Sequence, residues 1–299
     1  MAENYYIETG EEFRCDACSA KERFLKLYDH HDVSVNTGNL AANVKKYHDF
    51  PGYLFKGCIA VCSSCGYGKM LSPPSGEELE SYYKALFWKQ REVRVDQARE
   101  GVVSRNHQLR SEHQIEMAMR FKSANNVFQT LEIGAGEAFA SQCLKTINED
   151  IRTCICEAGA QWDSHYESLG LEKIAGYFPF SGDEKFDLII ASHWLEHVLD
   201  VQAVLTAIRE KLKPDGLLVI DVPNTQYDYW DVPERDIPHI HFFTPESLVK
   251  LSENSRLKCR AVESYGISIM QRQAGIEIQP EDFAENKRGY GIRAVFSPA

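Results

Sequence analysis

The chain has 299 residues, of which 43% are hydrophobic and 26% charged, and its formal net charge at pH 7 is -11. This composition excludes a mainly disordered chain, and the length is typical of one large domain, alone or with a small appendage. The longest apolar runs, such as 217–220, are strand-sized and far below the roughly 18–20 residues that span a bilayer. The acidic chain has no clear basic patch, so nucleic acid is not an expected partner.

The N-terminal stretch Met1–Phe13 is acidic and lacks the apolar segment of a secretory signal. We therefore expect a cytoplasmic protein with no membrane partner. The chain also has nine cysteines. Without an export signal, reduced thiols or metal ligands are favoured over a disulfide framework.

Four of the cysteines form two Cys-x-x-Cys pairs, at Cys15 and Cys18 and at Cys62 and Cys65. This spacing lets one turn direct both sulfurs of a pair at a single ion, and two pairs complete a tetrahedral zinc site. Because four protein ligands leave no open position, we expect a structural zinc ion in an N-terminal module over residues 1–72. Competing ligands in the same segment are Cys58, His30, His31 and His48.

A Pro-rich linker at Ser72–Gly76 precedes a helical region, which we assign to residues 73–124. One helix is expected to begin at Glu77, and a second to cover His107–Lys122. Aromatic residues gather on the first of these helices. They either pack in the core or form a lid that excludes water from a site: Tyr82, Tyr83, Phe87 and Trp88.

From residue 125 to 299 buried strands alternate with helices. Strands are expected at 127–133, 153–157, 186–191 and 217–222, and helices at 138–148, 163–169, 201–212 and 245–255, the last capped by Thr244. The alternation predicts an α/β domain with a doubly wound, mostly parallel, Rossmann-like sheet. A turn is expected at 213–216, and two terminal strands near 258–264 and 290–296. Cys154 and Cys156 should face one side of their strand as core residues.

A glycine turn follows the first strand of this domain and opens a helix. Gly134 and Gly136 allow the backbone to approach a ligand closely, and Glu132 stands beside them. Glu157 ends the next strand, where a carboxylate can accept both hydroxyls of an adenosine ribose. The turn therefore predicts a cofactor that contains adenosine.

Two residues bear on which cofactor this is. Phe139 replaces the third glycine of the dinucleotide fingerprint, which counts against NAD. Glu132 would repel a pyrophosphate, but it suits the cationic amino group of an amino-acid-like cofactor. Charge complementarity therefore favours S-adenosylmethionine.

Residues 127–264 resemble the class I S-adenosylmethionine-dependent methyltransferases. Their first motif is similar to 132–136, their fourth-strand segment with its Leu-Glu-His signature to 186–198, and their "LkPgG" turn and fifth strand to 212–220. The segments 222–224 and 241–248 resemble a subgroup that acts on small molecules. The resemblance implies methyl transfer to a small-molecule acceptor.

An N-terminal double Cys-x-x-Cys module ahead of such a domain is similar to the nucleotide-sugar C-methyltransferases. This likeness implies a nucleotide sugar or saccharide as one class of acceptor. Those enzymes carry a further C-terminal domain that these 299 residues do not contain. Relatives often place an acid after the third strand to meet adenine, whereas aromatic residues stand here at Gly176–Pro179, so stacking or backbone contacts are expected instead.

Methyl transfer to oxygen or carbon needs a base, and histidine suits this role near neutral pH. His193 ends the fourth strand, at the sheet edge where ligands bind, and His197 follows one turn later. His239 and His241 follow an aromatic loop, Tyr227–Pro233. We favour His241 as the base and His193 as a catalytic or cofactor-contacting residue, and we expect no catalytic metal.

Three rival functions remain open at this point. An RNA or protein methyltransferase would use the zinc module to hold a macromolecule, which the net charge disfavours for RNA. A non-catalytic binding protein would have no need for Glu132, Gly134, Gly136 and Glu157 together. An NAD-dependent oxidoreductase is disfavoured by Glu132 and Phe139. The acceptor, the methylated atom, the base and the oligomeric state are not decided by the sequence.

Overall fold

A computed structural model describes residues 5–7, 14–21, 24–26, 59–70, 73–87, 92–99, 104–227, 229, 239–285 and 288–299. His30, His31, His48, Cys58 and Trp88, which the sequence singled out, lie outside these ranges, as do residues 228 and 230–233 of the aromatic loop. No helix in the part of the chain described is both long and apolar enough to cross a membrane.

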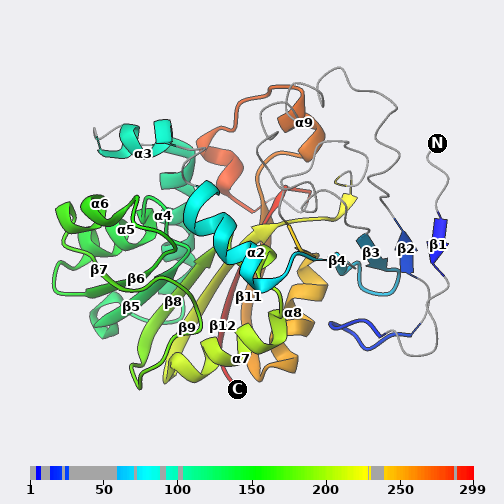
Figure 1. Ribbon diagram of the computed structural model, residues 1–299, viewed down its shortest axis with the longest axis horizontal. Coiled ribbons are helices and arrows are strands. Elements are labelled where there is room, and N and C mark those ends of the chain that lie inside the picture. Colours follow the sequence, from blue (N-terminus) through cyan, green and yellow to red (C-terminus); the bar gives the residue numbers. More distant parts are fainter. Residues whose placement is uncertain are drawn as a thin grey trace.

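Among the residues described, the larger of two sheets has seven strands in the order β11-β12-β9-β8-β5-β6-β7 (Figure 1). The strands from β7 to β9 run parallel, and β12 is antiparallel to both of its neighbours. This confirms the doubly wound, mostly parallel sheet that the alternation of strands and helices predicts. The bounds are β5 Gln129–Ile133, β6 Arg152–Cys156, β7 Glu172–Ala175, β8 Phe186–Ser192, β9 Leu212–Pro223, β11 Leu257–Tyr265 and β12 Gly291–Pro298.

Helices cover both faces of this sheet (Figure 1). On one face lie α4 (Arg105–Met119), α5 (Phe139–Ile147) and α6 (Asp163–Ser168), and on the other lie α7 (Val201–Lys211) and α8 (Pro245–Asn254). Cys154 and Cys156 are both buried in the hydrophobic cluster on the α7 and α8 face, as the alternation along a strand predicts.

The N-terminus of α8 begins where the sequence places it. The Thr244 hydroxyl accepts a hydrogen bond from the backbone N–H of Ser247 at 3.1 Å, which satisfies an otherwise unpaired helix amide. The same hydroxyl donates to the carbonyl of Cys65 at 2.7 Å. One side chain therefore caps the helix and ties it to the N-terminal region.

The turn expected at 213–216 is not a separate connection, because β9 already begins at Leu212. Phe186 pairs with Leu212 and Leu188 with Leu217, so residues 213–216 bulge out of a continuing strand. Gly216 makes this bulge possible, since a Cβ there would lie 2.8 Å from the Phe186 carbonyl oxygen. The backbone therefore approaches its neighbour too closely for any other residue.

A smaller antiparallel sheet lies beside the larger one, in the order β1-β2-β3-β4-β10 (Figure 1). The short strand β10 (His241–Phe242) comes from the C-terminal region and pairs with β4, His241 opposite Lys69. The N-terminal strands are therefore completed by a segment far away in sequence. The other bounds are β1 Tyr5–Ile7, β2 Phe24–Lys26, β3 Ile59–Cys62 and β4 Gly68–Met70.

The chain between β4 and β5 is helical, but it does not form one continuous helix. It consists of α2 (Gly76–Ser81), the π-helix η3 (Tyr82–Phe87) and α3 (Glu92–Arg99). The second expected helix is α4, which begins at Arg105. The remaining elements are short: η5 Ala124–Asn126, η6 Leu195–His197, α9 Ile269–Gln273 and η8 Pro280–Phe283.

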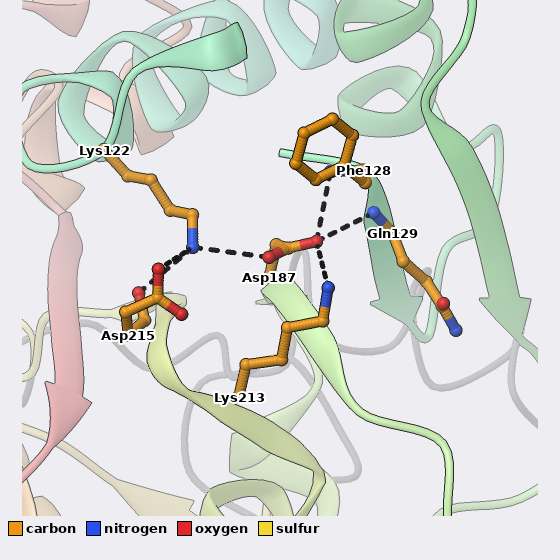
Figure 2. A network of polar contacts seen from close by, with 6 residues as sticks. All are labelled: Lys122, Phe128, Gln129, Asp187, Lys213 and Asp215. Atoms are coloured by element: carbon orange, nitrogen blue, oxygen red, sulfur yellow. Dashed lines mark hydrogen bonds and ion pairs between the residues drawn. The ribbon is translucent and has the colours of Figure 1, made fainter. Parts of the chain in front are cut away.

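A buried carboxylate, Asp187, joins three segments at the start of β8 (Figure 2). Its Oδ2 accepts from the backbone N–H groups of Phe128 and Gln129, both at 3.0 Å, and from Lys213 Nζ at 2.8 Å. Lys122 Nζ lies 3.3 Å from its Oδ1. Burial raises the pKa of Asp187, but these hydrogen bonds outweigh it and hold the pKa below its ordinary value.

Replacing this carboxylate is expected to be costly. The variant Asp187→Asn leaves the buried Lys122 ammonium with the exposed Asp215 carboxylate, 2.8 Å away, as its remaining charge partner. It also removes the charge from the other hydrogen bonds of Asp187, and it should lower the free energy of unfolding by about 1.5–3 kcal/mol. Because the folded pKa is depressed, the contribution of Asp187 is present above its ordinary pKa and is lost as pH falls through the folded value. Urea unfolding at neutral pH measures the cost. Lys213→Met is the control, because the partly exposed Lys213 should cost about 1 kcal/mol or less; equal losses would contradict this account.

Candidate functional site

A cavity of about 860 Å³ opens at the carboxyl ends of β5, β6 and β8. Its volume lies in the upper part of the range of about 300–1,000 Å³ that is typical of small-molecule sites. The wall includes Glu132, Gly134, Gly136, Glu157 and His193, which sequence reasoning selected. Because parallel strands end at one edge of the sheet, residues after three different strands meet here.

The glycine turn forms one side of the cavity. Gly134 and Gly136 have φ angles of +66° and +52°, which favour glycine, and the Gly134 N–H donates to the Cys156 carbonyl at 2.8 Å. A Cβ on Gly134 would lie 2.6 Å from Cδ1 of Trp194. The Tyr166 hydroxyl donates to the Gly136 carbonyl at 2.8 Å. The turn is therefore held by contacts from β6, from α6 and from Trp194.

Glu132 has a second task that the sequence did not reveal. Its Oε2 accepts from the backbone N–H and the hydroxyl of Ser141, at 2.8 and 2.7 Å, so it binds the first turn of α5. Burial raises the pKa of Glu132 to about 7. The carboxylate still lines the cavity, and a cation placed there would favour its ionised form.

Glu157 follows β6 and is 5% exposed. Its Oε2 accepts from the Gly136 N–H at 3.0 Å, so the acid after the second strand is bonded to the turn after the first. The geometry thus brings together the turn and the acid that the sequence predicts as one site.

Arg110 is a cavity residue that sequence reasoning missed. It lies on α4, it lines the cavity, and its Nε is buried with no hydrogen-bond partner among the residues described. A buried guanidinium nitrogen without a partner costs free energy, so an anionic ligand is the chemistry that suits it. Arg110 lies on the helix before the glycine turn, and no local sequence motif around it predicts its position in the cavity.

His193 has a backbone φ of +49°, which is uncommon outside glycine. Its N–H donates to the Asp221 carbonyl at 2.7 Å, and its ring lies between two carboxylates. Nδ1 is 3.3 Å from Glu196 Oε1, and Nε2 is 3.4 Å from Asp221 Oδ1. Burial lowers the pKa of His193 well below its ordinary value, so the ring is neutral at pH 7.

The other histidine candidates separate into two groups. His197 and His239 line the cavity with Glu196, and burial lowers the pKa of His239 to about 3. His241 is 1% exposed and outside the cavity lining. Its Nδ1 lies 2.6 Å from the Tyr67 hydroxyl, and its ring stacks on Tyr67. His241 therefore lies on β10, against Tyr67 and the small sheet, and not in the lining of this cavity. Its role as the base stays a prediction.

Aromatic side chains close other parts of the wall. Tyr83 and Phe87 of η3 line the cavity, whereas Tyr82 is 1% exposed and packs against both of their rings. Tyr177 and Phe178 follow β7 and also line it. The aromatic residues after the third strand are thus at the cavity, where the sequence expects adenine contacts.

The two Cys-x-x-Cys pairs come together away from the cavity. Cys15 Sγ lies 3.6 Å from Cys65 Sγ, and Cys18 Sγ lies 3.6 Å from Cys62 Sγ. All four sulfurs lie within 4.8 Å of one another, and none forms a disulfide. The hydrogen bond from the Cys65 thiol lowers the pKa of Cys15 to about 5. Tetrahedral ligation by four thiolates is the chemistry that this donor set fits.

A family profile described as a methyltransferase domain matches residues 88–262, which is more than half of the chain. Two ubiquinone biosynthesis O-methyltransferases are similar in sequence. That of Idiomarina loihiensis is 27% identical over 139 residues, 42% of this chain and 53% of the relative. That of Bartonella bacilliformis is 29% identical over 115 residues, 34% of this chain and 44% of the relative. The matches thus span about half the length of these relatives.

Solved structures extend the likeness to the fold. A complex between the Trm112 methyltransferase activator of Haloferax volcanii and a methyltransferase contains a chain with a TM-score of 0.51 and 13% identity. The match covers 71% of this chain and 96% of that one. At this identity the likeness shows the fold alone.

The glycine turn gives a test of the cavity geometry. Gly134 and Gly170 have nearly equal φ angles, +66° and +64°, but an added Cβ meets Trp194 at the first and nothing within 4 Å at the second. Both alanine variants should lose about 1–2 kcal/mol to the left-handed backbone. We expect Gly134→Ala to lose clearly more in denaturant unfolding, because Trp194 must move; equal losses would argue against the close contact.

Proposed function

The chain belongs to the methyltransferase-domain family that its residues 88–262 match, and from this premise we propose that it is an S-adenosylmethionine-dependent methyltransferase with a small-molecule acceptor. One observation carries the proposal. The Gly134–Gly136 turn, Glu157 and Arg110, whose Nε is buried, all line one cavity at the carboxyl edge of the sheet. This is where open α/β sheets bind their ligands.

The cavity residues fit each part of this cofactor. The positive φ angles of the turn let backbone amides approach a ligand, and Glu157 suits the ribose hydroxyls. The cofactor carries an ammonium and a carboxylate on its methionine end. Glu132 supplies the negative partner and Arg110 the positive one. Tyr177 and Phe178 supply aromatic surface for adenine.

The relatives are named for O-methylation, so we take a hydroxyl oxygen as the acceptor. Bound S-adenosylmethionine supplies a methyl group on a good leaving group, and the protein must align the acceptor and remove its proton. His193 is the group we assign to the proton, because its neutral ring lines the cavity and its Nε2 has no hydrogen-bond partner among the residues described. Asp221, 3.4 Å from Nε2, stabilises the imidazolium that forms.

Calorimetry with S-adenosylhomocysteine tests the cofactor assignment. Glu157→Ala should weaken binding by about 1.5–3 kcal/mol, roughly 10- to 150-fold, because a charged hydrogen-bonding partner is lost. Glu172→Ala is the matched control, since this acid is exposed on β7 and pairs with Arg152. Binding of NAD with no binding of S-adenosylhomocysteine would overturn the proposal.

When cofactor binding has been measured, a screen with a labelled methyl donor would identify the acceptor. The compounds to screen are hydroxylated metabolites, nucleotide sugars included.

We further propose that Cys15, Cys18, Cys62 and Cys65 hold one structural zinc ion. Support comes from the four sulfurs within 4.8 Å of one another, and from the small size of the hydrophobic cluster that the described residues Ile59, Val61 and Phe242 of the small sheet form with Tyr229. Cys62→Ser should remove about one equivalent of zinc per chain and lower the melting temperature. Cys143→Ser is the control, because this partly buried thiol lies outside the cluster. Unchanged zinc in Cys62→Ser, measured by elemental analysis, would contradict the assignment.

A further inference from the structure

Three side chains of the cavity wall converge beside His193. Glu196 Oε1 lies 3.8 Å from His197 Nε2 and 4.0 Å from His239 Nε2. One ligand atom from each of the three lies within 4.8 Å of the other two, and all three residues line the cavity. The proposed roles of the cofactor and base residues do not use this cluster, and the sequence led us to expect no metal here.

The separations distinguish between two explanations. An N–H···O hydrogen bond joins atoms about 2.7–3.2 Å apart, so the contacts from Glu196 to the two imidazoles are too long to be such bonds. Ligand atoms that each lie about 2.0–2.2 Å from one metal ion are roughly 3–4 Å apart from each other. The separations of 3.8 and 4.0 Å therefore match those between ligands of one shared ion, and the same Glu196 oxygen lies 3.3 Å from His193 Nδ1.

The fold holds the three residues in place from two directions. Glu196 and His197 belong to η6, directly after β8, and the His197 N–H donates to the Trp194 carbonyl at 3.0 Å. His239 comes from the segment before β10. The next residue, Ile240, donates its N–H to the Glu196 carbonyl at 2.7 Å, which fixes this segment against η6. The rings of His197 and His239 are 4.9 Å apart in an edge-to-face arrangement.

We propose that Glu196, His197 and His239 bind one divalent metal ion, for which zinc is the best fit. Two imidazoles and one carboxylate form the donor set of zinc sites that keep an open position for a ligand. Among the residues described, three ligands converge here and line the cavity, so the open position of a bound ion would be available to the acceptor. No redox chemistry is needed, which makes zinc sufficient.

The role of the ion rests on the proposed function. A cation beside the acceptor hydroxyl lowers the pKa of that hydroxyl. The O–H proton passes to His193, and the oxygen electron pair forms the bond to the methyl carbon while the carbon–sulfur bond breaks. The products are the methyl ether, S-adenosylhomocysteine and one proton, so atoms and charge balance. The acceptor class is therefore a hydroxyl compound that can bind a metal through oxygen.

Cobalt titration of the full metal-free chain, without cofactor, tests the site. The wild type should take up about two equivalents. One should give the thiolate-to-cobalt charge-transfer band of the four cysteines, and the other should add ligand-field bands without increasing that band. A titration in which every bound equivalent contributes to the thiolate band, with no equivalent that adds ligand-field bands alone, would overturn the proposal without any variant.

Variants then locate the second ion. His239→Ala and His197→Ala should each reduce uptake from about two equivalents to one, with the thiolate band unchanged. His113→Ala is the control, because this histidine lies on α4 outside the cavity lining and should keep both. Circular dichroism checks that the variants fold. Retention of two equivalents by both folded cluster variants would exclude these ligands.

Calorimetry with S-adenosylhomocysteine on the same proteins separates this inference from the proposed function. Loss of the second ion with cofactor binding retained supports the metal site. Failure of the wild type to bind the cofactor would overturn the proposed function, while the titration would still decide whether the metal site exists.

Discussion

Parallel strands in register must end together, and the candidate site follows from this constraint. Ile133 at the end of β5 pairs with Cys156 of β6 on one side and with Ala191 of β8 on the other. The residues that follow each strand therefore meet at one edge: the glycine turn, Glu157 and His193. The bond from the Gly136 N–H to Glu157 then connects two of these ends directly. Residues far apart in sequence thus become neighbours because the strands that they follow are paired.

The small sheet is attached to this edge by backbone pairing. Ile240 accepts from the Met70 N–H at 2.8 Å and donates to the Glu196 carbonyl at 2.7 Å, so one residue connects β4 to the cavity wall. The Thr244 hydroxyl adds a bond to the Cys65 carbonyl. A metal ion on the four cysteines would thus stabilise more than the two Cys-x-x-Cys turns. The reason is that β4 follows Cys65 and pairs with β10, and His239 lies directly before β10. Cys15, Cys62 and Cys65 also belong to the hydrophobic cluster on the α7 and α8 face, so a metal ion on these cysteines would be attached to the larger sheet as well.

The sequence predicted what depends on local pattern. Alternating strands and helices, the Thr244 cap, the glycine turn with Glu157 and the two Cys-x-x-Cys pairs all have short-range signals, and the structure contains each. It could not predict which histidine faces the cavity, because β10 pairs with a strand about 170 residues earlier and directs His241 to Tyr67. The convergence of His239 with Glu196 and the position of Arg110 have the same origin. Both depend on packing between segments that carry no shared motif.

The charge inside the cavity connects the proposals. Its described lining contains Glu80, Glu132, Glu137, Glu157, Glu196 and Asp200 but only two arginines, Arg110 and Arg272. The buried acids among them resist ionisation, and burial accordingly raises the pKa of Glu132 to about 7 and that of the neighbouring Asp221 above its ordinary value. A cationic ligand lowers the free-energy cost of ionising these acids, because its positive charge stabilises each carboxylate beside it. S-adenosylmethionine brings a sulfonium and an ammonium to the glycine turn, and a divalent ion would do the same at Glu196. The acidic wall of the cavity therefore favours ligands that carry positive charge over neutral or anionic ones.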